Sequence, residues 1–329
     1  MSPRADIGSV IIGRNEGERL ARCLDSVLSQ VAVAVYVDSG STDDSVAMAR
    51  ERGVEVVRLD LDRPFTAARA RNEGLARLVE IASEIRFVQF IDGDCELREG
   101  WIEAAYAQLM LHPKLVVVCG RRRERFPETS VYNALCNVEW DGNPGEVDSS
   151  GGDALMRCDA LQSVGGFNPR LIAGEEPDLC YRLRRAGGTV LRLEHEMTWH
   201  DAAMMRLGQW WKRARRAGYA FAENHWDHRV DRAGFRSSDV RRILFWGGAV
   251  PIALLGLSIW RPWCAVGILV FPLQAFRISR KLDPMPTKRG LAIRYAWSCV
   301  LGKFPEILGV LQYHVNRIVG RRGSLIEYK

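Results

Sequence analysis

The chain has 329 residues, 47% of them hydrophobic, so it is long enough to bury a substantial core. Its net charge of +6 collects in short Arg and Lys clusters beside apolar stretches, which argues against nucleic acid as a partner. The eight cysteines form no Cys-x-x-Cys pair, so the pattern predicts no zinc site and is typical of a reducing compartment.

The first half of the chain alternates short apolar runs with helical patterns. Strands are expected at residues 9–12, 32–37, 54–59, 87–92 and 115–119. Helices are expected after Asn15, which has Glu18 three residues on as in a capping box, after Ser41 and Thr42, and at 67–79 and 102–111. This alternation predicts an α/β fold with a mostly parallel sheet flanked by helices. Because the N-terminus lacks the apolar region of a signal peptide, we expect this part in the cytosol.

Two nucleotide-binding motifs are missing from the sequence. The loop from Gly13 to Gly17 is not a Gly-x-Gly-x-x-Gly fingerprint, and no Gly-x-x-x-x-Gly-Lys-Ser/Thr loop occurs. A dinucleotide-dependent dehydrogenase or a P-loop enzyme is therefore not expected.

Two carboxylates, Asp92 and Asp94, end the apolar run that begins at Phe87. In open α/β sheets, ligands bind at the carboxyl ends of the strands. Two acids so close repel each other unless a cation joins them, and Mg²⁺ takes oxygen ligands that it often shares with phosphates. The pattern predicts a metal and phosphate site, and the alternative is a surface turn at Gly93.

Other strand ends also carry polar groups. Arg14 and Glu16 follow the first strand, and Asp38 follows the second. We expect Asp38 to contact a base or ribose, whereas Ser41 and Asp43 are expected to cap the following helix.

A second acidic pair, Glu175-Glu176, follows Gly174 and precedes a predicted helix that has Pro177 at its first position. The helix dipole keeps such carboxylates ionised and able to accept a proton. Acids at this position often serve only to stabilise the helix, but their glycine-rich approach favours a catalytic role.

Five motifs, taken in chain order, resemble those of the inverting family 2 glycosyltransferases with the GT-A fold. They are Asn15-Glu16, the run from Val37 to Asp43, the run from Ala70 to Gly74, Asp92-Gly93-Asp94, and the run from Gly174 to Leu179. The resemblance implies transfer of a sugar from a nucleotide-sugar donor with the help of Mg²⁺ or Mn²⁺.

The resemblance also implies roles for single residues. The residues assigned to the nucleotide sugar are Arg14, Glu16, Asp38, Arg71, Asp92 and Gly93. Asp94 is assigned to the metal, with His200 as a further ligand, and Glu176 to the general base, with Glu175 and Asp178 as alternatives. Gly151-Gly152-Asp153 would lie on the acceptor side of the cleft.

The composition changes at Ile243. From Ile243 to Trp260 about 18 residues carry no formal charge, and a second apolar run of about 14 follows from Trp263 to Phe276. Arginines flank the pair on both outer sides, which favours a hairpin that enters the membrane from the cytosol. The alternative is a buried helical pair in a soluble domain. Residues 291–319 are expected to form helices in the plane of the membrane interface.

Together these features predict a catalytic domain at 1–235, a membrane-inserting apolar hairpin at 236–281 and an amphipathic tail at 282–329. The expected protein is a glycosyltransferase of the cell inner membrane, with its catalytic domain on the cytoplasmic side. It would use a nucleotide sugar, a UDP-sugar as the first guess, and a lipid-linked glycan or polysaccharide acceptor. The alternatives are a polyprenyl-phosphate glycosyltransferase and a non-catalytic nucleotide-sugar-binding membrane scaffold.

Overall fold

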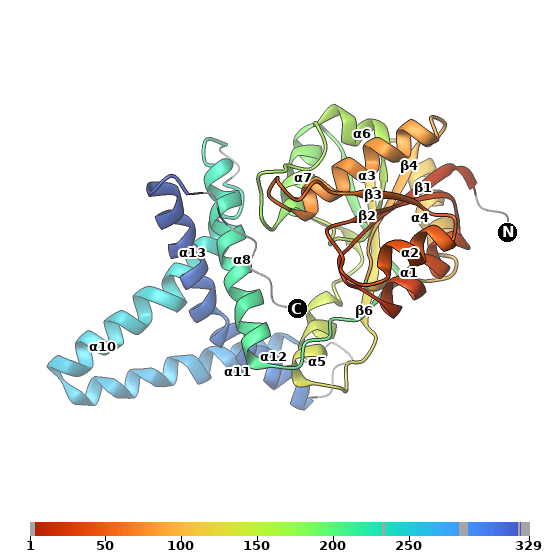
Figure 1. Ribbon diagram of the computed structural model, residues 1–329. Helices are drawn as coiled ribbons and strands as arrows, with labels where there is room; N and C mark the ends of the chain where they lie inside the picture. The colour runs from red at the N-terminus through yellow and green to blue at the C-terminus, as the bar shows by residue number, and fades with distance from the viewer. Residues whose placement is uncertain (1–3, 232–233, 283–288, 322, 324–329) are drawn as a thin grey trace. The chain divides into compact units, whose positions relative to one another are not determined.

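The computed structural model describes residues 4–231, 234–282, 289–321 and 323 (Figure 1). The chain forms two compact units by its internal contacts. Residues 1–125 and 140–202 form the sheet unit, and residues 126–139 and 203–329 form the helical unit. The predicted boundaries after residues 235 and 281 separate a catalytic domain, a membrane hairpin and a tail. A division of the chain by its internal contacts does not test them, so they stay predictions.

Nine strands form one mixed sheet in the described part of the sheet unit, in the order β3-β2-β1-β4-β8-β6-β9-β5, with β7 paired to β9. The strands are β1 (Arg4–Gly13), β2 (Val31–Asp38), β3 (Glu55–Arg58), β4 (Phe87–Asp92), β5 (Cys95–Leu97), β6 (Leu115–Glu124), β7 (Gly145–Glu146), β8 (Ala154–Arg157) and β9 (Thr189–His200). The pairs β1–β2, β1–β4, β2–β3 and β6–β9 are parallel, whereas β8 runs antiparallel to β4 and β6. This confirms the predicted α/β fold with a mostly parallel sheet.

Helices flank this sheet (Figure 1). They are α1 (Glu18–Leu28), α2 (Ser45–Glu51), α3 (Ala67–Ile81), α4 (Trp101–Leu111), α6 (Cys158–Ser163) and α7 (Glu175–Arg185). The apolar face of α1 is buried through Leu20, Leu24 and Val27, as their helical spacing predicts. The start of α3 is fixed by Thr66, whose hydroxyl accepts the Arg69 backbone N–H at 3.1 Å.

Two predicted helix caps are wrong. Asn15 adopts a left-handed φ of 56° and turns its amide oxygen to the backbone N–H of Thr42, so α1 begins only at Glu18, with Gly17 as its N-cap. The hydroxyl of Ser41 accepts the Asn15 backbone N–H at 2.9 Å instead of capping α2. These two side chains join the loops after β1 and β2 to each other.

The helical unit contains the C-terminal apolar region. Its elements are α5 (Val131–Trp140, all but the last residue), α8 (Leu207–Asp227), α9 (Ser237–Leu244), the π-helical turn η1 (Phe245–Ala249), α10 (Val250–Trp260), the 3₁₀ helix η2 (Pro262–Leu269), α11 (Val270–Leu282), α12 (Arg289–Leu301) and α13 (Lys303–Ile318). The π-helical turn ends at Ala249, two residues before Pro251, which has no backbone N–H to donate to the preceding turn.

The predicted apolar hairpin is helical in both arms, over Ser237–Trp260 and Pro262–Leu282. Both segments are long and apolar enough to cross a membrane, by length and composition only. Only 11% and 6% of their most apolar windows are buried within the described chain, so the two arms do not form a helical pair buried by the chain itself. The other end of the unit packs closely, since a Cβ on Gly309 of α13 would lie 2.0 Å from the Arg215 carbonyl oxygen of α8.

Candidate active site

The strand register brings the first group of predicted site residues to one edge of the sheet. Gly13 of β1 is level with Asp38 of β2, and Ile12 is level with Asp92 of β4. Because these strands are parallel, the loops after all three begin at the same edge. Asp38 and Asp92 therefore lie on the side where ligands of such sheets bind.

Asp38 is 1% exposed, and its carboxylate holds its own loop. The backbone N–H groups of Gly40 and Ser41 donate to it at 3.2 Å. This arrangement is an Asx-type turn, in which the side chain fixes the two residues that follow. A contact between Asp38 and a nucleotide base stays a prediction.

Glu16 and Gly93 meet beside the end of β4. The Glu16 carboxylate pairs with Arg19 at 2.8 Å, and its Cγ would lie 3.3 Å from a Cβ at position 93. Glycine at position 93 thus leaves room for the Glu16 side chain. Arg14 is exposed in the same loop.

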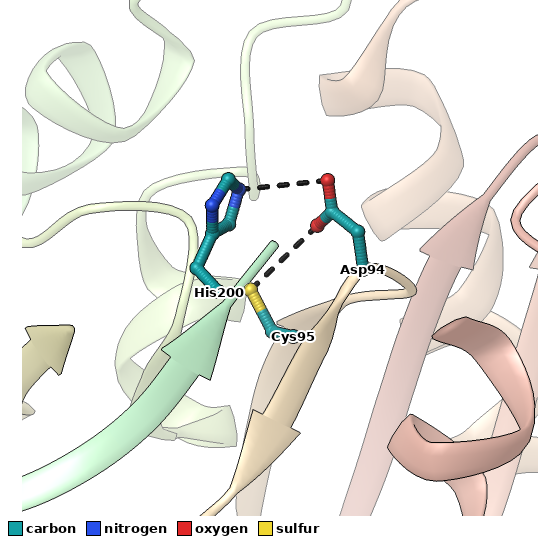
Figure 2. A group of neighbouring side chains, drawn as sticks. All are labelled: Asp94, Cys95 and His200. Carbon is teal, nitrogen blue, oxygen red and sulfur yellow. Dashed lines mark hydrogen bonds and ion pairs between the residues drawn. The ribbon is translucent and has the colours of Figure 1, made fainter. Parts of the chain in front are cut away.

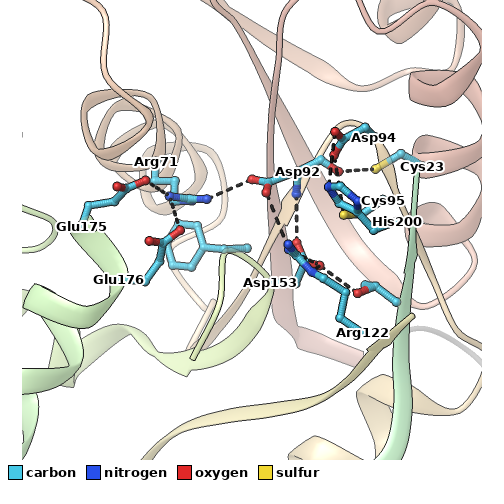
Figure 3. Close-up of polar contacts among 12 residues, drawn as sticks. Cys23, Arg71, Asp92, Asp94, Cys95, Arg122, Asp153, Glu175, Glu176 and His200 are labelled. Carbon is cyan, nitrogen blue, oxygen red and sulfur yellow. Dashed lines mark hydrogen bonds and ion pairs between the residues drawn. The ribbon is translucent and has the colours of Figure 1, made fainter. Parts of the chain in front are cut away.

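A buried Arg71 on α3 joins the two acidic motifs of the chain. One of its terminal nitrogens, Nη2, lies 2.9 Å from Asp92 Oδ1. The other, Nη1, lies 2.8 Å from Glu175 Oε1 and 3.1 Å from Glu176 Oε1 (Figure 3). Burial opposes the charge of this guanidinium, but the three carboxylates together raise its pKa. One cation therefore holds acids from β4 and α7 in a single group.

Gly152 makes room for this ion pair. It stands beside β4 just before β8, and a Cβ there would lie 2.7 Å from Asp92 Oδ2 and 2.8 Å from Arg71 Nη2. A side chain at position 152 would therefore force the guanidinium and the carboxylate apart.

The helix α7 begins at Glu175, two residues earlier than predicted, with Gly174 as its left-handed N-cap at φ 77°. Both glutamates thus lie in the first turn, and Pro177 is its third residue. No hydrogen bond is lost at Pro177, because the first backbone N–H groups of a helix have no partner within it.

The three acids of α7 differ in exposure and in partners. The Glu176 side chain is 16% exposed, against 5% for Glu175 and 3% for Asp178. Asp178 accepts a hydrogen bond from Arg182 Nε at 2.9 Å, one turn along the same helix. Burial, followed by the charge of Glu175, raises the pKa of Glu176 to about 7 against the lowering effect of Arg71. Of these acids, Glu176 is the most accessible, and it can exchange a proton near neutral pH.

Asp94 and His200 lie together because of the strand pairing. Cys95 of β5 is opposite His200 of β9, which brings His200 Nε2 to 3.5 Å from Asp94 Oδ2 (Figure 2). Burial lowers the pKa of His200, so its imidazole is neutral at pH 7, the form that binds metals. The indole ring of Trp140 packs edge-on against the imidazole, with ring centroids 4.5 Å apart.

This group can be tested for its fit to a divalent metal ion. Asp94, Cys95 and His200 each offer a ligand atom within 4.8 Å of the others. Two ligand atoms at about 2.1 Å from one ion are separated by roughly 3 to 3.5 Å, which matches the Asp94–His200 pair. Burial raises the pKa of Cys95 well above its usual value, which disfavours the thiolate form in which cysteine binds metals. Asp94 and His200 therefore fit a metal that accepts one carboxylate and one imidazole.

Arg122 belongs to the same group and was missed from the sequence, where it stood only within a basic cluster. It lies on β6, its side chain is 15% exposed, and its Nη2 is 3.6 Å from Asp92 Oδ2 (Figure 3). It also pairs at 2.6 Å with Asp153, whose Oδ1 accepts the Asp92 backbone N–H at 3.2 Å, and the acceptor-side role of Asp153 stays a prediction. No signal in the sequence distinguishes Arg122 from its neighbours Arg121 and Arg123 before the register of β6 is known.

Comparisons with known proteins show what the first part of the chain is similar to. Residues 9–162 match the family described as glycosyl transferase family 2. The pre-mycofactocin glycosyltransferase of Mycobacterium tuberculosis is 29% identical over 208 residues, which cover 58% of this chain and 41% of that protein. Glycosyltransferase AglE of Haloferax volcanii is 24% identical over 186 residues, 53% of this chain and 59% of that protein. The chain thus spans less than two thirds of the length of these curated relatives.

Solved structures share the fold over nearly the whole chain. The mannosyltransferase PcManGT from Pyrobaculum calidifontis, solved in complex with GDP-Man and Mn²⁺, superposes with a TM-score of 0.66 at 15% identity. The match covers 96% of this chain and 90% of that one. Residues 1–349 of TarS from S. aureus give a TM-score of 0.50 at 17% identity, over 95% and 92% of the two chains. At these identities the likeness concerns the fold alone.

Proposed function

We propose that this chain, which carries a glycosyl transferase family 2 domain at residues 9–162, is an inverting, metal-dependent glycosyltransferase. The sugar moves from a nucleotide-sugar donor, a UDP-sugar as the first candidate, to a hydroxyl group of the acceptor. The single observation that carries the proposal is the Arg71 guanidinium, which joins Glu176 to Asp92 at 3.1 and 2.9 Å. The proposed general base, Glu176, and the carboxylate proposed to bind the donor, Asp92, are thus both ion-paired to the buried Arg71.

Glu176 is the proposed general base. Its raised pKa of about 7 suits a group that must take a proton from a hydroxyl and still be ionised at neutral pH. The acceptor oxygen attacks the anomeric carbon as Glu176 removes its proton, and the bond from that carbon to the diphosphate breaks. Attack from the face opposite the leaving group inverts the configuration in one displacement. Glu175 is more deeply buried and lies 2.8 Å from Arg71. We propose that its negative charge helps to raise the pKa of Glu176.

Asp94 and His200 are the proposed metal ligands. A divalent ion bound there would offset the negative charge that develops on the departing diphosphate. Mg²⁺ prefers oxygen ligands throughout, whereas Mn²⁺ also accepts an imidazole, so we propose Mn²⁺ ahead of Mg²⁺. The Mn²⁺ named with the mannosyltransferase of similar fold supports this order.

The nucleotide sugar is proposed to bind at the edge formed by the loops after β1, β2 and β4. The Asx-type turn at Asp38 gives this edge a fixed shape, and exposed Arg14 adds a positive charge. The residues proposed for this site are Arg14, Glu16, Asp38, Arg71, Asp92 and Gly93.

We propose that residues 236–281 insert into the cell inner membrane as a hairpin and that the catalytic domain at 1–235 faces the cytoplasm. The two arms carry large exposed apolar side chains, such as Ile252 at 72% and Ile259 at 78%, which water solvates poorly. Arg241 and Arg242 stand near the start of the first arm, just before its uncharged run from Ile243, as expected for a cytoplasmic end.

The tail, residues 282–329, is proposed to lie in the membrane interface. Leu308, Leu311 and Val315 give α13 an exposed apolar face, opposite the face packed on α8. Residues 283–288, 322 and 324–329 of this tail lie outside the described residues. An enzyme held at the bilayer in this way has a lipid-linked glycan as its proposed acceptor.

Two alternatives differ from this proposal in their chemistry. A polyprenyl phosphate acceptor is already ionised and requires no base, so the position and pKa of Glu176 favour a hydroxyl acceptor. A non-catalytic scaffold requires no group of buried acids, which costs free energy to hold together.

The decisive experiment is a panel of labelled nucleotide sugars given to the full chain with Mn²⁺ and a native lipid extract. We expect the label of one donor to become lipid-soluble, and Glu176→Gln to remove this transfer. Transfer by wild type that survives in Glu176→Gln would favour a phosphate acceptor, and no transfer from any donor would favour the scaffold.

A further inference from the structure

Asp153 is a fully buried acid to which the proposed function gives no task. It lies between Gly152 and the start of β8, and its side chain is 0% exposed. Its Oδ1 accepts the backbone N–H of Asp92 at 3.2 Å, and its Oδ2 accepts the Thr198 hydroxyl of β9 at 2.8 Å (Figure 3). One carboxylate therefore joins the end of β4, which carries the acidic motif, to the strand that carries His200.

The same carboxylate binds Arg122. The guanidinium Nε donates to Asp153 Oδ2 at 3.0 Å, and Nη2 lies 2.6 Å from that oxygen. Nη2 also lies 3.6 Å from Asp92 Oδ2, at ion-pair distance but beyond hydrogen-bond length. Burial opposes the charge of Arg122, and Asp153, ahead of Asp92, raises its pKa. Arg122 is thus a buried cation between two acids and is held closer to Asp153.

The distances from Arg122 to Asp92 and to Asp153 determine how strongly Arg122 neutralises the Asp92 carboxylate. Arg71 already holds Asp92 Oδ1 at 2.9 Å, and a second cation that closed on Oδ2 would compete with a bound metal ion for that carboxylate, because a charge-assisted hydrogen bond is strong in a buried site. Asp153 supplies Arg122 with a better partner and leaves Asp92 Oδ2 at the longer distance. Its bond to the Asp92 backbone also fixes the turn that leads to Asp94.

We infer that Asp153 is a positioning residue for the candidate metal and donor site. Its carboxylate fixes the end of β4 and holds Arg122 at the longer distance, so that Arg122 adds no second close cation to the Arg71 already bound to Asp92 and the turn to Asp94 keeps its direction toward a metal ion. The inference rests on the proposed function, since it assigns Asp153 to the same site, and it places Asp153 behind the acidic motif rather than in contact with the acceptor.

The test is the Mn²⁺ affinity of the full chain, measured without any sugar donor by electron paramagnetic resonance of the free ion. In Asp153→Asn the amide oxygen can still accept from Asp92, but the amide offers no negative charge to Arg122. We expect Arg122 to turn to Asp92 and Mn²⁺ affinity to fall about 10- to 100-fold, as for other groups that orient metal ligands. The double variant Asp153→Asn with Arg122→Gln removes the buried cation, and its affinity should return to within about threefold of wild type.

Asp178→Asn is the matched control, because Asp178 is likewise a buried acid bound to an arginine at 2.8 Å. It should lower the melting temperature as Asp153→Asn does, yet leave Mn²⁺ affinity unchanged. If Asp153→Asn does not fold, Asp153→Glu takes its place, because the longer side chain keeps the charge but displaces the carboxylate from Arg122 and from the Asp92 backbone, and its Mn²⁺ affinity should fall as well.

Wild-type affinity in Asp153→Asn, or equally weak binding in the double variant, would overturn the inference and leave the proposed function standing. A wild-type chain that binds no Mn²⁺ at millimolar concentration would overturn the proposed metal site and this inference together.

Discussion

The sheet unit buries charged side chains, whereas the helical unit exposes apolar ones. The sheet unit buries charge, with Arg71 2% exposed and Glu175 4% exposed. The helical unit exposes apolar groups, with no buried residue in α10 or η2. Each arrangement costs free energy in the chain by itself, because buried charge loses its hydration and exposed hydrocarbon orders water. The comparison fits the proposal that each unit meets something outside the chain, a charged ligand for the first and a membrane for the second.

The largest expected effect concerns the buried charge of Glu176. Glu176→Gln should reduce kcat by about 1,000-fold, since an amide cannot take a proton, and leave donor affinity within about threefold. Steady-state kinetics and calorimetric titration of the donor measure the two quantities. Glu80→Gln, an exposed glutamate on α3, is the control and should behave as wild type. Full kcat in Glu176→Gln would move the base elsewhere.

The second prediction concerns the proposed metal ligands. Asp94→Asn should weaken Mn²⁺ binding by about 100-fold, because it removes the one carboxylate of a two-residue ligand set. Asp25→Asn removes a mostly exposed carboxylate from the same unit and should have no effect. Equal Mn²⁺ affinity in Asp94→Asn and wild type would show that the buried acids serve another purpose.

The third prediction tests the exposed apolar side of the comparison. Ile252→Lys should weaken binding to lipid vesicles by roughly 30-fold, or about 2 kcal/mol, because a lysine near the middle of an apolar span is costly. Flotation with vesicles measures the bound fraction. Leu61→Lys replaces an equally exposed apolar residue of the sheet unit, 66% exposed, and should leave binding unchanged. If both variants lost vesicle binding equally, or neither lost any, the exposed apolar residues of the helical unit would have no special role in membrane binding.

The smallest expected effect is on pH dependence. Burial and Glu175 raise the pKa of Glu176 to about 7, and the base works only when ionised. The value of kcat/KM should therefore fall about tenfold per pH unit below pH 7 and level off above it. Glu175→Gln removes one of the causes of the raised pKa, so the midpoint should move to lower pH. A midpoint that stays in place would show that another group controls the profile.

The sequence was sufficient to predict most of the first half of the fold. The apolar run ending in Asp92 forms β4 as expected, and α3 begins at the predicted Ala67 because Thr66 caps it. The caps at Asn15 and Ser41 were wrong because these side chains bind each other's loop, 26 residues apart in the chain. Local patterns cannot reveal a competition between a local cap and a distant partner. The long strand β9 was also missed, since its polar residues hide the alternation of a strand.

The candidate site was predictable as a set of residues but not as an arrangement. Asp92, Asp94 and Glu176 stood out by their motifs, whereas the bond between Arg71 and Glu175 joins residues 104 positions apart. Arg122 and Asp153 gained their roles only through the pairing of β4, β6, β8 and β9. Buried ion pairs depend on register, and a single residue of slip would direct each of these side chains to the other face of the sheet.

The bare backbone at Gly152 has a consequence for how this protein can be altered. A single added methyl group there would meet Asp92 Oδ2 and Arg71 Nη2 first and would separate this ion pair. Because Arg71 also binds Glu175 and Glu176, a substitution at position 152 would change the surroundings of the proposed base and of the proposed donor-binding acid together. Substitution of Gly152 is therefore a way to alter the pH dependence without changing the acidic motifs themselves.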